Sequence, residues 1–175
     1  MNIRYTRGIV NIKNDDQKCF LWSILVALHP VSGHPERISH YKDYENELNM
    51  KDIEFPVSLS KVEIFEKQNM ISVNVFGFEE GEVFPLHISK LENGSKEVDL
   101  LYLSNEDQAH YCWIKNLDHF LRSTTRFSHR RFYCRRCLHG FVRKDLLDEH
   151  RLYCKRFDFQ RVTYPKEGAN EILEF

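Results

Sequence analysis

One cysteine lies where a polar segment gives way to an apolar one, and its position suits a nucleophile. An Asn-Asp-Asp run leads into Cys19, and the chain then has no glycine or proline before Pro30. Asn and Asp often cap helix starts, so the sequence predicts a helix of about ten residues, buried on most faces, with Cys19 in its first turn. The N–H groups of a helix start favour a thiolate, the form of cysteine that attacks carbonyl groups. A buried cysteine without chemical function is the alternative.

A nucleophilic cysteine needs a base, and His110 is the histidine best placed for that role. It opens a predicted strand directly after an acidic loop. His29 lies on the same predicted helix as Cys19, about 15 Å further along, which is too far for proton transfer. A cysteine at a helix start that faces a histidine on a sheet is the geometry of papain-like proteases. The oxyanion hole is then expected from the Cys19 backbone N–H and a side chain of Asn14 or Gln17.

The residue that orients the His110 imidazole is expected in the loop before it. Gln108 shares the strand face of His110, because it lies two residues earlier. Asp107 would reach the same place through a β-bulge. A carboxylate stabilises a charged imidazole better than an amide does, so we favour Asp107 and keep Gln108 as the alternative.

The C-terminal third contains four residues with the types and spacing of zinc ligands. They are Cys134, Cys137, His150 and Cys154. The spacing C-x2-C-x12-H-x3-C is typical of a tetrahedral zinc site in a small ββα finger. Phe141 and Leu147 stand at the two core positions of such a finger. We therefore predict one structural Zn²⁺, which replaces the hydrophobic core that so small a unit lacks.

Charge and cysteine usage divide the chain and indicate its surroundings. Residues 1–118 contain 12 Lys+Arg and 19 Asp+Glu, whereas residues 119–175 contain 13 and 7. The acidic part suits basic ligands, and the basic part suits phosphates or an acidic surface. The cysteine number is odd, which argues against a secreted disulfide framework. No apolar run is long enough for a membrane span, so we expect an intracellular protein, cytoplasmic or nuclear, without a membrane partner.

The order of elements predicts an α+β fold. Helical patterns over 19–28, 35–48 and 58–70 precede strand patterns over 71–76, 83–88, 98–103 and 109–115. This order is typical of helices packed on an antiparallel sheet. We predict three regions: the first domain over 1–122, the finger over 123–160, and a linker or tail over 161–175.

Three segments carry a resemblance to known proteins. They are Asn14-x-Asp16-x-x-Cys19-Phe20-x-Trp22-Ser23, His110-Tyr111-x-x-Ile114-Lys115-Asn116-Leu117 and Tyr133-Cys134-x-x-Cys137-Leu138-His139-Gly140-Phe141. Together they resemble the N-terminal region of proteins encoded by Polinton (Maverick) DNA transposons, upstream of a family B DNA polymerase. The first domain also resembles papain-like deubiquitinases related to the herpesvirus large tegument protein. That family has the order Cys … Asp-x-His, and Gln108 stands where it has the Asp.

The resemblance implies a papain-like cysteine protease that cleaves at the C-terminal glycine of ubiquitin. Tyr111 is similar to the aromatic residue that follows the catalytic histidine in many deubiquitinases and narrows the channel for the ubiquitin tail. An ordinary strand aromatic is its alternative. Our main hypothesis is thus a deubiquitinase with an appended zinc finger, in which Cys19 attacks and His110 transfers the proton.

Two other hypotheses fit the same sequence. The chain could be a nucleic-acid-binding accessory module of a transposon polymerase, with an inactive protease-like fold and a basic finger as its working surface. It could also be a papain-fold enzyme that cleaves another peptide or amide bond. The reactivity of Cys19 relative to Cys112, which the strand pattern buries, distinguishes an active enzyme from an inactive fold.

Overall fold

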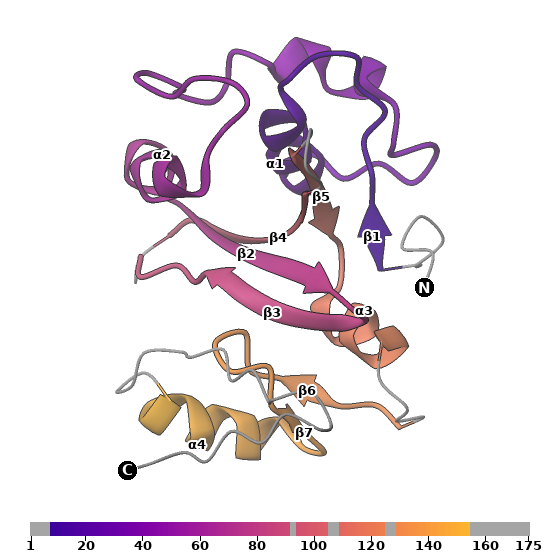
Figure 1. The fold of residues 1–175 in the computed structure, drawn as a ribbon, viewed down its shortest axis with the longest axis vertical. Helices are drawn as coiled ribbons and strands as arrows, with labels where there is room; N and C mark the ends of the chain where they lie inside the picture. The colour runs from indigo at the N-terminus through magenta and orange to yellow at the C-terminus, as the bar shows by residue number, and fades with distance from the viewer. Residues whose placement is uncertain (1–7, 92–93, 105–108, 125–128, 155–175) are drawn as a thin grey trace, which may run out of the picture.

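A computed structural model describes residues 8–91, 94–104, 109–124 and 129–154 (Figure 1). A five-stranded sheet lies at its centre, in the order β1-β5-β4-β2-β3. The strands are β1 Ile9–Val10, β2 Ile71–Glu79, β3 Glu82–His87, β4 Lys96–Ser104 and β5 Ala109–Ile114. The helices around the sheet are α1 Cys19–Leu28, α2 Val62–Asn69 and α3 Leu117–Thr124. The predicted α+β class is confirmed, and a papain-like fold stays a prediction.

Helix α1 is the central element of the first core, as its sequence predicts. It begins at Cys19 and ends just before Pro30, and nine of its ten residues are buried. Its apolar side chains pack with α2 residues such as Phe65 and with Tyr111 of β5. A helix apolar on nearly all faces is stable only inside a core, which explains why the sheet and the following loops surround it.

The sheet is mixed, so the antiparallel sheet expected from the sequence is wrong. Strand β4 pairs in parallel with β2, from Ile71 opposite Lys96 to Gly77 opposite Tyr102. Strands β3 and β5 are antiparallel to their neighbours. The β2–β3 hairpin occupies the outer edge, and the chain then returns to the start of β2 before β4 begins. The first seven residues of β2 are all buried, which is typical of a strand covered on both faces.

The segment expected to form a helix over 35–48 contains two short 3-10 helices instead, Ile38–His40 and Lys42–Tyr44. Of the expected apolar face, Tyr41 and Leu48 are buried, but Tyr44 is 40% exposed. The Tyr41 hydroxyl donates to the Pro35 carbonyl oxygen at 3.0 Å. Two buried side chains seven residues apart provide too little packing to hold a continuous helix, because isolated helical turns are marginal in water.

The C-terminal unit is a ββα finger built from β6 Phe132–Tyr133, β7 Gly140–Phe141 and α4 Lys144–Cys154. It packs below the sheet in Figure 1, on the side away from α1 and α2. Tyr133 joins Phe76, Leu101 and Phe120 in a second core cluster on that face. The molecule therefore has one core on each face of the sheet. No helix among the described residues is long and apolar enough to cross a membrane.

Candidate functional site

The four predicted metal ligands come together in the structure. One ligand atom from each of Cys134, Cys137, His150 and Cys154 lies within 4.8 Å of the others. The Cys134 and Cys154 sulfurs are 3.9 Å apart, and Nε2 of His150 lies 3.2 Å from the Cys137 sulfur. The cluster can thus hold one metal ion, and the predicted ligand set is confirmed as a spatial group.

Local structure positions these ligands. The Cys134 N–H donates to the His139 carbonyl oxygen at 3.0 Å, and the Leu138 N–H donates to the Cys134 carbonyl oxygen at 2.7 Å. These bonds close a tight turn, in which Leu138 has a positive φ of 57°. His150 and Cys154 lie one turn apart on α4. A hydrogen bond from the Cys137 thiol lowers the pKa of Cys134, which favours the thiolate form that binds metals.

Cys19 lies in the first turn of α1, as predicted, but its thiol is buried. Its exposed fraction is 4%. Burial raises the pKa of Cys19, while backbone N–H groups of Tyr111 and Phe20 act in the opposite direction. The expected preference for a thiolate is therefore outweighed by burial, and the free protein holds a neutral thiol.

His110 lies in β5 opposite Leu103, one residue before the Tyr111 amide that faces the Cys19 sulfur. Burial lowers the pKa of His110, so its imidazole is neutral at pH 7. Among the described residues, no hydrogen bond joins this imidazole to the Cys19 thiol. Leu103, the cross-strand partner of His110, packs against the second core cluster, whereas Cys19 belongs to the first. The structure therefore places the Cys19 thiol next to the backbone of β5 and does not join it to the imidazole.

The imidazole of His110 has a partner that the sequence did not indicate. Its Nε2 lies 2.7 Å from the amide oxygen of Asn11, just beyond the edge strand β1. A carboxamide oxygen only accepts, so Nε2 carries the hydrogen and Nδ1 is the basic nitrogen. Asn11 lies within residues 1–13, which alternate loosely between apolar and polar types, and nothing there marks it as a partner of His110. Asp107 and Gln108 lie outside the described residues.

Of the two side chains expected in the oxyanion hole, Asn14 has other hydrogen-bond partners and Gln17 is exposed to solvent. The Asn14 side-chain amide donates to the backbone and carboxylate oxygens of Asp16, at 2.6 and 2.9 Å. Gln17 is exposed. The role of either side chain in an oxyanion hole stays a prediction.

Asp16, one of the residues expected to cap the helix start, organises the loop before Cys19, while the N-cap position itself is Lys18. Its carboxylate accepts hydrogen bonds from the Lys18 backbone N–H at 2.9 Å and from the Trp22 indole N–H at 3.1 Å. Burial alone would raise its pKa, but these bonds and one from Asn14 lower it below the usual value. A carboxylate three residues before Cys19 therefore ties the loop to α1.

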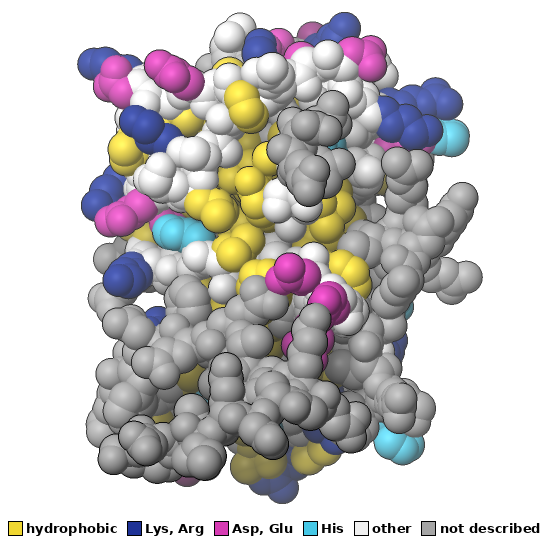
Figure 2. Space-filling model, viewed as in Figure 1, with side chains coloured by type: hydrophobic (Ala, Val, Ile, Leu, Met, Phe, Trp, Pro, Cys, Tyr) yellow, Lys and Arg dark blue, Asp and Glu magenta, His cyan; other side chains and the backbone are white. Residues whose placement is uncertain are grey.

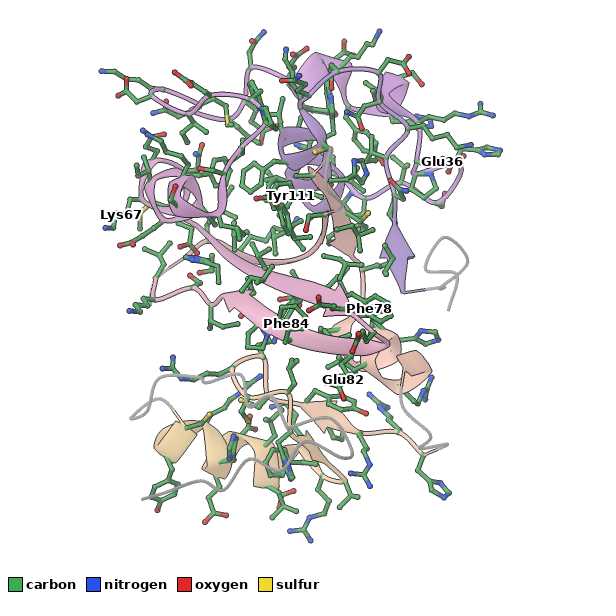
Figure 3. All side chains as sticks on the ribbon, in the orientation of Figure 1. Glu36, Lys67, Phe78, Glu82, Phe84 and Tyr111 are labelled. Carbon is green, nitrogen blue, oxygen red and sulfur yellow. The ribbon has the colours of Figure 1, made fainter. Side chains whose placement is uncertain are left out.

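Tyr111 and Cys112 are both core residues. Tyr111 is fully buried, its hydroxyl donates to the Val57 carbonyl oxygen at 3.0 Å, and its ring lies 5.2 Å from that of Phe20 (Figure 3). Its role in a ubiquitin-tail channel stays a prediction. Cys112 is 1% exposed, and burial raises its pKa to about 12, as expected for an inert thiol.

Comparisons with protein-family models, curated proteins and solved structures find no match for this chain.

Proposed function

We propose that the chain is a cysteine hydrolase of the deubiquitinase type, with Cys19 as nucleophile and His110 as general base. The hydrogen bond between Asn11 and Nε2 of His110 is the observation that carries the proposal. It fixes the tautomer in which Nδ1 accepts a proton, and Asn11 then has the role of the orienting residue. Asp107 and Gln108 remain candidates for the same role, but neither has a described contact.

In the proposed reaction, Nδ1 of His110 takes the proton of the Cys19 thiol as the sulfur attacks the substrate carbonyl carbon. The developing oxyanion accepts a hydrogen bond from the Cys19 backbone N–H at the start of α1. The leaving amine takes the proton from the imidazolium, and a thioester remains on Cys19. Water, deprotonated by His110, then hydrolyses the thioester and restores the thiol.

The resting geometry requires a rearrangement before this reaction. The sulfur contacts the N–H of Tyr111, which is covalently joined to the carbonyl of His110. The rearrangement must bring the Cys19 sulfur to Nδ1 while Nε2 keeps its bond to Asn11. We propose that substrate binding exposes Cys19 and brings the two groups within proton-transfer distance.

The ubiquitin specificity rests on the sequence resemblance and on charge. The excess of Asp and Glu in residues 1–118 would attract the basic tail of ubiquitin. The test is hydrolysis of a fluorogenic amide at the C-terminus of ubiquitin, compared with the same fluorophore on a short unrelated peptide. We expect cleavage of the ubiquitin substrate by the wild type and none by Cys19→Ala. Equal cleavage of both substrates would instead support an enzyme for other peptide or amide bonds.

We further propose that the metal of the Cys3His cluster is Zn²⁺. Three thiolates and one imidazole form a common donor set for structural zinc. Such a site is closed, so the ion would hold the finger together and take no part in the reaction. Native mass spectrometry of the full chain should find one zinc per chain, and Cys154→Ser should reduce its retention.

A nucleic-acid-binding function is the second candidate, and one observation favours it. A cavity of about 270 Å³ between the finger and the sheet has four basic residues and two aromatic ones in its lining, beside the carboxylates of Asp99 and Asp118. The basic residues are Lys115, Arg135, Lys144 and Arg151. Basic and aromatic side chains together suit a nucleotide. The test is DNA and RNA binding at 50 and 200 mM salt. Tight binding with a steep salt dependence that Lys115→Ala reduces, together with an unreactive Cys19, would favour this function.

A further inference from the structure

One arginine of the finger contacts the sheet through hydrogen bonds and ion pairs with two carboxylates. Nε of Arg135 lies 2.9 and 3.0 Å from the two carboxylate oxygens of Asp99 in β4. Its Nη1 lies 3.1 Å from a carboxylate oxygen of Glu97. The Asp99 side chain is only 7% exposed and that of Arg135 30%. A largely buried carboxylate needs such a cation, because burial without a partner is costly.

The sheet holds its half of this contact in place. Asn74 lies opposite Asp99 in the parallel β2–β4 pair and is 2% exposed. Its amide nitrogen donates to Asp99 at 2.9 Å, and its oxygen accepts from the Ser89 N–H at 3.1 Å. The socket for Arg135 is therefore built from residues of the first domain.

The turn that holds the metal ligands positions Arg135, which is the other half of this contact. Arg135 stands between two of the ligands, Cys134 and Cys137, in the tight turn described above. On the other side of Cys134, the Tyr133 N–H donates to the Asp118 carboxylate at 2.9 Å. The turn that holds Cys134 and Cys137 is thus attached to β4 and to α3 at once.

We propose that the finger is a zinc-dependent docking element for the sheet, anchored by Arg135, and that its zinc loop faces this chain and not nucleic acid. This inference rests on the proposed zinc and is independent of the hydrolase activity. The two basic residues of α4 fit it, since Lys144 and Arg151 both pair with Asp148. Loss of the ion would release Arg135 and leave Asp99 buried without its cation.

Hydrogen exchange of the full chain, read on β2 and β4, tests the proposal. Arg135→Ala is compared with Arg143→Ala, which removes a similar two-bond contact with Asp145, 3.1 and 2.8 Å long but on an exposed surface. We expect zinc chelation and Arg135→Ala each to accelerate exchange in β4 at least about tenfold, and Arg143→Ala to leave it unchanged.

Zinc content measured on the same samples separates the two parts of the proposal. One zinc per chain in Arg135→Ala, with faster β4 exchange, assigns the effect to the contact. Should chelation unfold α4 while exchange in β2 and β4 stays at the wild-type rate, the docking role is wrong. If the purified chain holds no zinc, the zinc dependence is wrong, and Arg135→Ala still tests the contact.

A second variant covers the case in which Arg135→Ala does not fold. Arg135→Lys keeps the charge and loses the planar donor group that reaches Asp99 and Glu97 together. We expect a hydrogen-exchange rate in β4 that lies between the rate of the wild type and the rate of the chelated protein. Exchange equal to the wild type would overturn the role of Arg135 as anchor.

Discussion

Burial governs the chemistry of the two residues on which the proposed reaction depends. It raises the pKa of Cys19 and lowers that of His110, so the resting pair is a neutral thiol and a neutral imidazole. A preformed thiolate–imidazolium pair would need each group to stabilise the charge of the other. In the proposed reaction, His110 therefore removes the thiol proton during the attack.

The pH profile of kcat/KM tests this protonation state. The pKa of His110 is lowered from 6.5, so the base stays unprotonated until the pH falls below that value. We expect activity to fall only below pH 6.5, where the imidazole becomes protonated, and to stay level up to about pH 9, because the pKa of the Cys19 thiol is raised from 9.0. A bell-shaped profile that declines above pH 8 would indicate an ion pair and contradict this account.

Asn11 offers a second test at the residue scale. Without its amide oxygen, the His110 ring loses the contact that fixes its tautomer. We expect Asn11→Ala to lower kcat about a hundredfold with little change in KM. Gln108→Ala is the matched comparison. A large loss of kcat in Gln108→Ala with none in Asn11→Ala would return the orienting role to the loop before β5.

At the scale of elements, α1 connects the candidate site to the first core. Its central side chains are buried, and Leu25 is fully so. We expect Leu25→Ala to lower the free energy of unfolding by about 2–5 kcal/mol, measured by denaturant titration, because the cavity cannot collapse fully. Ile64→Ala on α2, where the side chain is 38% exposed, should cost much less. Equal losses would show that α1 is not the centre of this core.

The sequence could predict the elements that depend on local spacing, but not the contacts between distant segments. The α1 helix and the metal ligands depend on local spacing, and both were predicted from residues close together in the chain. The contact between Asn11 and His110 joins residues 99 positions apart and depends on the pairing of β1 with β5. The parallel β2–β4 pair has no local signature, because a hairpin such as β2–β3 also begins an antiparallel meander.

At the scale of the molecule, one sheet separates two cores, and the finger belongs to the second. Charged side chains of both signs are interspersed around the hydrophobic ones on the face in Figure 2, with no single charged patch in the described part of that face. Part of the positive charge of the finger pairs with negative charge of the first domain inside the molecule, because Arg135 forms ion pairs with Glu97 and Asp99. The finger is therefore better described as part of the fold than as a tethered module.

Tyr133 tests this integration. It is 6% exposed and packs in the core cluster on the finger side of the sheet. We expect Tyr133→Ala to lower the stability of the whole chain by about 3 kcal/mol in a single thermal transition. Leu152→Ala, on the 69% exposed side chain of α4, is the control and should change little. Separate transitions for finger and sheet in the wild type would contradict a shared core.

The most direct test of the proposed function is labelling by a ubiquitin probe with a thiol-reactive group at its C-terminus. Wild type, Cys19→Ala and Cys112→Ala are compared as zinc-loaded full chains, and mass spectrometry identifies the modified residue. We predict one adduct, on Cys19, that persists in Cys112→Ala and is absent from Cys19→Ala. A folded, zinc-loaded wild type without an adduct, or with the probe on a finger cysteine, would contradict the deubiquitinase account.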